Sequence, residues 1–241
     1  MAKMTLDELV RQLQLVYGSA LRCVVLYGSA ARGDQIEKRS DLNVLTVVDA
    51  IDMEHLKRAG AVTRSWREAG NPPPLTLTVA EWNGSADIFP IEYADILAHH
   101  RVLHGALLTD GIRVNRSDLR LQLEHEAMSK LLRLCHAVLS NVDDTRALTQ
   151  LLDESVASLL VLLRATLRLM GEEPPADSAV MLERATVRTA IDVDAVRVVL
   201  DHVRGAKKIE SAAAFGLAGG YLQAVAELVR FLDRYEMSAQ R

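Results

Sequence analysis

The sequence predicts an α+β protein in two parts: a mixed sheet with helices, followed by an antiparallel helical bundle. Short apolar runs separated by turns fill the first part. After about residue 117, apolar residues recur instead at helical spacing, and a break near residues 111–115 separates the two patterns. We therefore expect one domain over residues 1–112 and a second over residues 113–241.

The first part is predicted to open with a helix, because Thr5 and Glu8 have the spacing of a capping box. The apolar runs at residues 23–27 and 41–48 predict two strands, and the segment 28–33 between them predicts a turn and a short helix start. Asp52 is the expected N-cap of a helix over residues 53–69.

Two further strands are predicted after the broken segment at residues 70–74. Residues 75–79 alternate between apolar side chains and threonine, which predicts a strand with one solvated face. Residues 88–93 also predict a strand, which Pro90 confines to an edge or a bulge. Residues 96–108 are expected to form a helix and a short apolar tail.

The second part is predicted to be helical throughout. Its expected helices begin at Ser117 or Asp118, at Asp143 or Asp144, and then at residues 178, 192 and 214. Their apolar stripes predict packing as an antiparallel bundle.

Composition favours a soluble globule with small substrates. The chain has 241 residues, 49% of them hydrophobic, and a formal net charge of −4. A protein that grips long nucleic acid usually carries a basic excess, so we do not expect a polynucleotide partner. Cys23 and Cys135 lie in apolar runs, and no signal peptide or bilayer-spanning run is apparent, which predicts reduced thiols, no membrane and a cytoplasmic location.

The segment 24–48, VVLYGSAARGDQIEKRSDLNVLTVV, contains the residues that suggest chemistry. A buried strand that turns through Gly28 lets backbone N–H groups approach a phosphate. In the second strand, Asp41 and Asn43 are two residues apart and face the same side, while Leu42 and Val44 face the core. Oxygen ligands on one strand beside a phosphate seat suit Mg²⁺.

Gly28-Ser29, Arg32-Gly33 and Ser40-Asp41-Leu42-Asn43 together resemble the signature of the DNA polymerase β-like nucleotidyltransferase superfamily. In that pattern a Gly-Ser pair precedes Asp-x-Asp by about a dozen residues, and the resemblance covers roughly the first hundred residues. It implies a fold with a small mixed sheet and transfer of a nucleoside monophosphate from a triphosphate to an acceptor.

The resemblance also implies roles for single residues. Gly28 and Ser29 would hold the β- and γ-phosphates, and Asp41 would be a ligand to Mg²⁺. Arg32, Lys38 and Arg39 are candidates to neutralise the triphosphate, with the choice among them open.

A third carboxylate is expected from a later strand. Glu92 is the first candidate from its position in the run 88–93, and Asp87 and Asp95 are the alternatives. In the family this acid binds the catalytic metal or takes the proton of the acceptor.

Asn43 departs from the family pattern, which has a second carboxylate there. An amide oxygen can bind Mg²⁺ but brings no charge, so two ions would face about two carboxylates instead of three. The departure keeps open a second class of function, a catalytically impaired nucleotide-binding regulator or antitoxin.

The domain order looks like that of aminoglycoside nucleotidyltransferases, where the bundle forms part of the acceptor pocket and a dimer contact. The first hypothesis is therefore a Mg²⁺-dependent nucleotidyltransferase that acts on a small-molecule or protein hydroxyl, and a homodimer is one expected assembly. In the bundle, Arg197 and His202 have the Arg-x4-His spacing of HEPN-type ribonucleases, a pattern that is common by chance.

Overall fold

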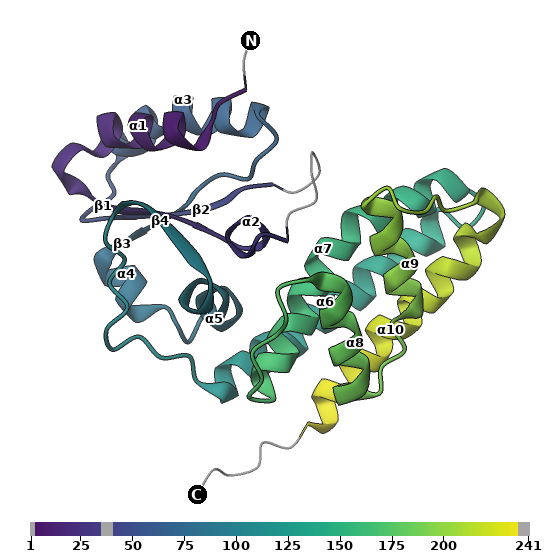
Figure 1. Ribbon diagram of the computed structural model, residues 1–241. Coiled ribbons are helices and arrows are strands. Elements are labelled where there is room, and N and C mark those ends of the chain that lie inside the picture. Colours follow the sequence, from purple (N-terminus) through teal and green to yellow (C-terminus); the bar gives the residue numbers. More distant parts are fainter. Residues whose placement is uncertain (1–2, 35–40, 236–241) are drawn as a thin grey trace, which may run out of the picture. The chain divides into compact units, whose positions relative to one another are not determined.

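A computed structural model describes residues 3–34 and 41–235 and divides into two compact units, Met1–Val114 and Asn115–Arg241 (Figure 1). The first unit combines a four-stranded sheet with helices, and the second consists of helices. The predicted α+β class is confirmed.

The first unit begins with a capped helix. Its elements are α1 (Leu6–Tyr17), η1 (Gly18–Ala20), β1 (Leu21–Tyr27), α2 (Ser29–Arg32), β2 (Asn43–Val48), α3 (Met53–Glu68), β3 (Leu75–Thr78), α4 (Val79–Gly84), α5 (Pro90–Ala98) and β4 (His100–Gly105). The hydroxyl of Thr5 accepts the Glu8 amide at 3.2 Å, and Asp52 caps α3 through the His55 amide at 2.7 Å. Both predicted N-caps are thus present.

The sheet has the strand order β3-β2-β1-β4. β1 pairs antiparallel with both β2 and β4, and β2 pairs parallel with β3. β1 is therefore one of the two inner strands, and its carboxyl end at Tyr27 is flanked by Asn43 on β2 and His100 on β4.

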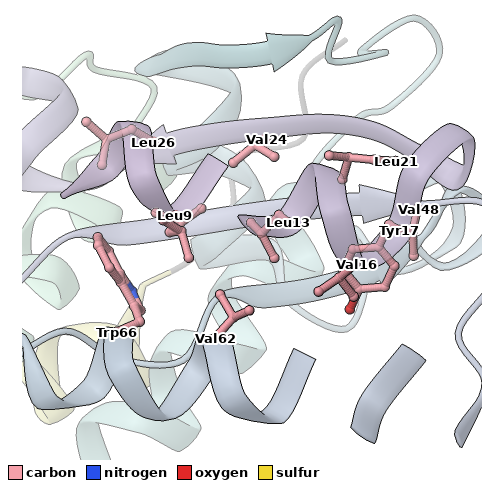
Figure 2. Close-up of a cluster of buried hydrophobic side chains, with 11 residues drawn as sticks. Leu9, Leu13, Val16, Tyr17, Leu21, Val24, Leu26, Val48, Val62 and Trp66 are labelled. Atoms are coloured by element: carbon pink, nitrogen blue, oxygen red, sulfur yellow. The ribbon is translucent and has the colours of Figure 1, made fainter. Parts of the chain in front are cut away.

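Helices cover both faces of this sheet (Figure 1). On one face, Leu9 and Leu13 of α1 and Trp66 of α3 pack against Val24 and Leu26 of β1, as Figure 2 shows. These side chains are almost completely buried, so each stabilises the unit by about 1.5–3 kcal/mol relative to an exposed position.

On the other face, α4 and α5 pack against the alternate strand residues. Trp82 of α4 and Tyr93 of α5 stack with ring centroids 4.5 Å apart, and the Tyr93 hydroxyl donates to the Trp82 carbonyl at 2.8 Å. These contacts hold α5 against the face that carries Val25 and Leu45.

Two predictions for residues 88–108 were wrong. The segment predicted as a strand at 88–93 instead begins α5, with Pro90 in the first helical turn, where its missing N–H breaks no hydrogen bond. The predicted helix over 96–108 ends at Ala98 and is followed by β4. This edge strand is exposed along much of its length and carries two histidines and an arginine, so it lacks the apolar alternation of a half-buried strand.

The second unit packs its helices around α7. Its elements are α6 (Arg116–Ser140), α7 (Thr145–Leu169), α8 (Ser178–Thr189), α9 (Asp194–Val203), η2 (Ser211–Ala213) and α10 (Ala214–Arg234). Asp144 and Asp177 cap α7 and α8 through two backbone amides each. The stretch Ser211–Arg234 is long and apolar enough to cross a bilayer, but α10 packs against α6, α7 and α9 as a bundle helix.

Candidate functional site

The candidate site lies where β1 ends and α2 begins. Gly28, the residue before α2, has φ 77° and ψ −154°, a region that is nearly restricted to glycine. A Cβ built on Gly28 would lie 3.1 Å from Nδ2, the side-chain amide nitrogen of Asn43. The turn and the Asn43 side chain thus approach so closely that a Cβ at this position would require the Asn43 side chain to shift.

The pleat places the Asn43 side chain beside that of Tyr27. The two residues are direct partners across the antiparallel β1–β2 pair, so their side chains project from the same face of the sheet. This is also the face that α5 covers, because Val25 and Leu45 pack there with Tyr93. Leu42 and Val44 pack on the opposite face.

Asp41 precedes β2 and is exposed. The amide of the next residue, Leu42, donates to the side-chain oxygen of Asn71 at 3.0 Å. Asn71 belongs to the segment between α3 and β3, and it anchors the backbone directly after Asp41. A carboxylate that must meet a ligand gains from such anchoring because less conformational entropy is lost on binding.

Three carboxylates act on the Tyr27 hydroxyl. Burial is the largest cause that raises the pKa of Tyr27 to about 12, and the negative charges of Glu92, Asp95 and Asp41 contribute to the same rise. A phenol senses charges in this way only at short range. Glu92 and Asp95 of α5 and Asp41 before β2 therefore lie near the carboxyl end of β1.

Glu92 reaches this position from a helix, not from the predicted strand. It lies one turn from Asp95 on α5 and is half-buried. Asp87 is exposed in the segment before α5, where its charge acts on Tyr93. Of the three candidate acids, Glu92 and Asp95 thus lie near Tyr27.

Arg32 is engaged by one of these acids. Its guanidinium donates to both Asp95 oxygens, at 2.6 and 2.7 Å, and the two side chains are only 5% and 15% exposed. Both hydrogen bonds come from one nitrogen, Nη1, and a charge-assisted pair with so little solvent is a strong interaction. Arg32 can meet a phosphate only if the phosphate replaces or joins Asp95. The other two basic candidates, Lys38 and Arg39, lie outside the described residues.

The donors present fit one Mg²⁺ ion better than two. Asp41, Asn43 and Glu92 offer hard oxygen atoms, the kind that Mg²⁺ prefers. However, none of the four strands carries a carboxylate, and among residues 3–34 and 41–235 no three His, Cys, Asp or Glu side chains group closely enough to hold an ion. An ion here would need phosphate oxygens of a nucleotide to complete its ligands.

Sequence reasoning missed Tyr27, Asn71 and the pairing role of Asp95. Tyr27 had one usable signal, since it directly precedes the Gly28 turn. Asn71 and Asp95 join segments far apart in the chain, so no local pattern could have shown their contacts.

In the bundle, Arg197 and His202 each have another partner. Arg197 forms an ion pair with Glu183 at 3.1 Å. His202 accepts the Ile209 amide at 3.1 Å and lies 3.7 Å from Asp153. Both residues stabilise local packing in the second unit.

A solved structure has this fold. The chain resembles a spectinomycin adenyltransferase, AAD(9) from Enterococcus faecialis, which was crystallised with ATP and spectinomycin. The match has a TM-score of 0.56 and covers 94% of this chain and 97% of the other. This chain has a nucleotidyltransferase fold. The two sequences are 13% identical, so the likeness shows the fold alone.

Two other comparisons found no relative. No family model matches the sequence. No curated protein matches it either.

Proposed function

We propose that this chain binds a nucleoside triphosphate with Mg²⁺ beside Gly28 and transfers its nucleotidyl group to a hydroxyl of a small acceptor. The observation that carries the proposal is the close approach of the Asn43 side chain to the Gly28 turn, which brings the segment Asp41-Leu42-Asn43 beside the expected phosphate site. The likeness in fold to an adenyltransferase that holds ATP supports it.

Different residues would bind the phosphates and the metal ion. The backbone at Gly28 and Ser29 would hold the β- and γ-phosphates, since no side chain blocks the approach at Gly28. Asp41 and the amide oxygen of Asn43 would hold one Mg²⁺ ion, which neutralises phosphate charge when bound, and Glu92 is the candidate either for a further ligand or for the acceptor of the proton.

In the reaction, the acceptor oxygen forms a bond to the α-phosphorus, and the bond from that phosphorus to the β-phosphate oxygen breaks. Pyrophosphate leaves with the electron pair of the broken bond. The proton of the acceptor hydroxyl passes to a carboxylate, for which Glu92 is the candidate because it is half-buried beside Tyr27. We expect a small acceptor in the cytoplasm and no long nucleic acid, given the net charge of −4.

A labelled-transfer assay tests the proposal. The protein is incubated with Mg²⁺, each of the four α-labelled triphosphates and a library of hydroxylated small molecules. We expect transfer from one or more triphosphates, and a loss of about 100-fold or more in Asp41→Ala and Glu92→Gln. Asp87→Asn is the matched control, because Asp87 is an exposed acid just before α5 and should leave transfer unchanged.

The second candidate function is nucleotide binding without transfer, as in a regulator or antitoxin. Asn43, the strands without a carboxylate and the Arg32–Asp95 pair favour it, because each reduces the charge available for catalysis. In that case a triphosphate raises the melting temperature with no transfer in any acceptor pool, and Asn43→Asp strengthens Mg²⁺ binding. No thermal shift and no transfer at millimolar triphosphate would exclude both candidates.

A further inference from the structure

A buried lysine contacts an exposed serine where α6 and α7 pack together in the bundle (Figure 1). Lys130 of α6 is 6% exposed, and its ammonium donates to the Ser158 hydroxyl of α7 at 2.6 Å. Ser158 itself is exposed to solvent. An amine within hydrogen-bond distance of a serine that a reagent can reach is the arrangement of serine–lysine nucleophiles.

Neighbouring hydrogen bonds hold the end of Lys130 in this position. The ammonium also donates to the Ser155 carbonyl at 3.0 Å and to the Ser155 hydroxyl at 3.3 Å. The Ser155 hydroxyl in turn shares a hydrogen bond of 2.9 Å with the hydroxyl of Tyr221 on α10. Ser155 and Tyr221 are both buried, so packing and hydrogen bonds fix the amine beside Ser158 before any reagent arrives.

The surroundings of Lys130 favour a neutral amine. In the described part of the chain Lys130 forms no ion pair with a carboxylate, and its hydrogen-bond partners are hydroxyl and carbonyl oxygens. Burial, the largest cause, and the charge of Arg133 lower the pKa of Lys130 to about 8, against the opposing charge of Glu126. A carboxylate partner would keep the amine protonated. Without one, the amine can lose its proton near neutral pH and accept another.

We propose that Ser158 and Lys130 form a serine–lysine nucleophile that accepts an acyl group from a small activated ester. The Ser158 oxygen forms a bond to the acyl carbon, and the bond between that carbon and the alcohol oxygen of the ester breaks. The hydroxyl proton passes to the neutral Lys130 amine and then to the departing alkoxide. Both residues lie in the second unit, so this reaction is independent of nucleotide binding beside Gly28.

A fluorescent fluorophosphonate tests whether Ser158 is activated. Its phosphorus bonds to an activated serine oxygen and fluoride leaves, whereas ordinary surface serines do not react. We expect the whole chain to take up a single label, which tandem mass spectrometry places on Ser158, and we expect Ser158→Ala to take up none. An unlabelled Ser158 overturns the proposal.

Ser140 is the matched internal control for this labelling. It is an exposed helix serine whose hydroxyl donates to the His136 carbonyl at 2.9 Å, much as the Ser158 hydroxyl donates to the Ser155 carbonyl at 3.0 Å. Among the described residues, no hydrogen bond joins Ser140 to a lysine. Ser140 should stay unlabelled, and equal labelling of Ser140 and Ser158 contradicts a role for the lysine.

Lys130→Arg tests whether the amine acts as a base. Arginine keeps the charge and the hydrogen-bond donors but does not give up a proton, so the labelling rate should fall by about 100-fold or more. The circular dichroism spectrum should stay the same, and Lys57→Arg, at an exposed lysine of α3, should keep the wild-type rate. A wild-type rate in a folded Lys130→Arg variant contradicts the proposal.

The pH dependence of the wild-type chain tests the same role without a substitution. The charged groups that act on Lys130 are Arg133 and Glu126 of α6, and α7 and α10 present hydroxyls to it or to its partner Ser155. The labelling rate should rise with pH and level off above about pH 8, where the amine is neutral. A rate that rises without levelling off contradicts a lysine base, including where Lys130→Arg does not fold.

p-Nitrophenyl acetate tests the acyl transfer itself. After incubation with this ester, Ser158 should carry one acetyl group in the wild-type chain, and the same peptide should stay unmodified in Ser158→Ala. An unmodified Ser158 in the wild-type chain overturns acyl transfer even if the fluorophosphonate reacts.

Discussion

Gly28 is the residue on which the geometry of the candidate site depends. Its φ of 77° and ψ of −154° suit glycine alone, and the space for a Cβ is limited by the Asn43 amide at 3.1 Å. We expect Gly28→Ala to lower the free energy of unfolding by about 1–3 kcal/mol and to weaken nucleotide binding. Urea unfolding and a thermal-shift titration with triphosphate measure the two effects.

Gly60 provides the matched control for Gly28. It lies inside α3, where an added Cβ would meet only the end of the Arg64 side chain at an ordinary 3.7 Å. Gly60→Ala should therefore raise the free energy of unfolding by about 0.5–1 kcal/mol, since alanine loses less entropy in a helix. Equal destabilisation by both substitutions would contradict the special role of Gly28.

Lys130 is a buried cation in the bundle with hydroxyl and carbonyl partners. Its ammonium donates to the Ser155 carbonyl at 3.0 Å and to the Ser158 hydroxyl at 2.6 Å. Burial, the largest cause, and the charge of Arg133 lower the pKa of Lys130 from 10.5 to about 8, against the opposing charge of Glu126. The folded protein therefore releases this proton at lower pH than the unfolded chain does.

This difference in pKa predicts a pH effect on stability. Between pH 8 and pH 10.5 the unfolded chain binds more protons, so the free energy of unfolding rises with pH relative to a variant without the lysine. From pH 7 to pH 10, the wild type should gain about 1–3 kcal/mol over Lys130→Met in denaturant titrations. The same subtraction with Lys57→Met, an exposed lysine on α3, should show no such gain, and a flat result for Lys130 would refute the shift.

At the scale of elements, one ion pair joins α2 to α5. Arg32 and Asp95 are nearly buried, so Asp95→Ala would leave a buried guanidinium without this carboxylate and should cost about 3 kcal/mol. The comparison is Asp49→Ala, which removes the partner of Arg22 in a pair that is 56% and 40% exposed. That substitution should cost less than about 1 kcal/mol, because water screens and replaces the interaction.

Chemical denaturation of both variants measures how much each substitution lowers the free energy of unfolding. Similar costs for Asp95→Ala and Asp49→Ala would mean that the α2–α5 pair contributes no more than a surface pair. In that event Arg32 would be available to a triphosphate at little cost.

The elements that the sequence predicted well have local signals. Four helices begin after a capping side chain: Thr5, Asp52, Asp144 and Asp177. A cap depends only on one side chain and the next few residues, so it can be predicted locally. The failures at residues 88–108 have the opposite cause. Pro90 is compatible with the first turn of a helix or with an edge strand. The helix is favoured by Trp82, which stacks on Tyr93 and fixes α5 to the sheet.

The candidate site shows the same division between local features, which the sequence predicts, and tertiary contacts, which it does not. The spacing from Gly28 to Asp41 is a local pattern, and the structure adds that Gly28 lies against Asn43. The acids of α5 required the tertiary fold, because their approach to Tyr27 comes from packing of a helix that the sequence did not predict.

At the scale of the whole molecule, the chain divides between Val114 and Asn115 into two units with separate cores. The sheet unit buries Trp66 and Trp82 against its strands, and the bundle buries Tyr221 within its own helices. Each unit is near the usual size of an independent domain. If the two units are independent domains, each should fold when it is produced without the other.

We expect residues 115–241, produced alone, to fold into a helical protein with one cooperative thermal transition. Residues 1–114 should also fold alone, and a nucleotide should still raise their melting temperature. The physical reason is that Arg116, Lys130 and Tyr221 find hydrogen-bond partners inside the second unit, and Gly28 and Asn71 find theirs inside the first. Circular dichroism and calorimetry of the two fragments check both statements. A bundle fragment without cooperative unfolding would mean that each unit needs the other, and a thermal shift by triphosphate in the bundle fragment would place the nucleotide away from Gly28.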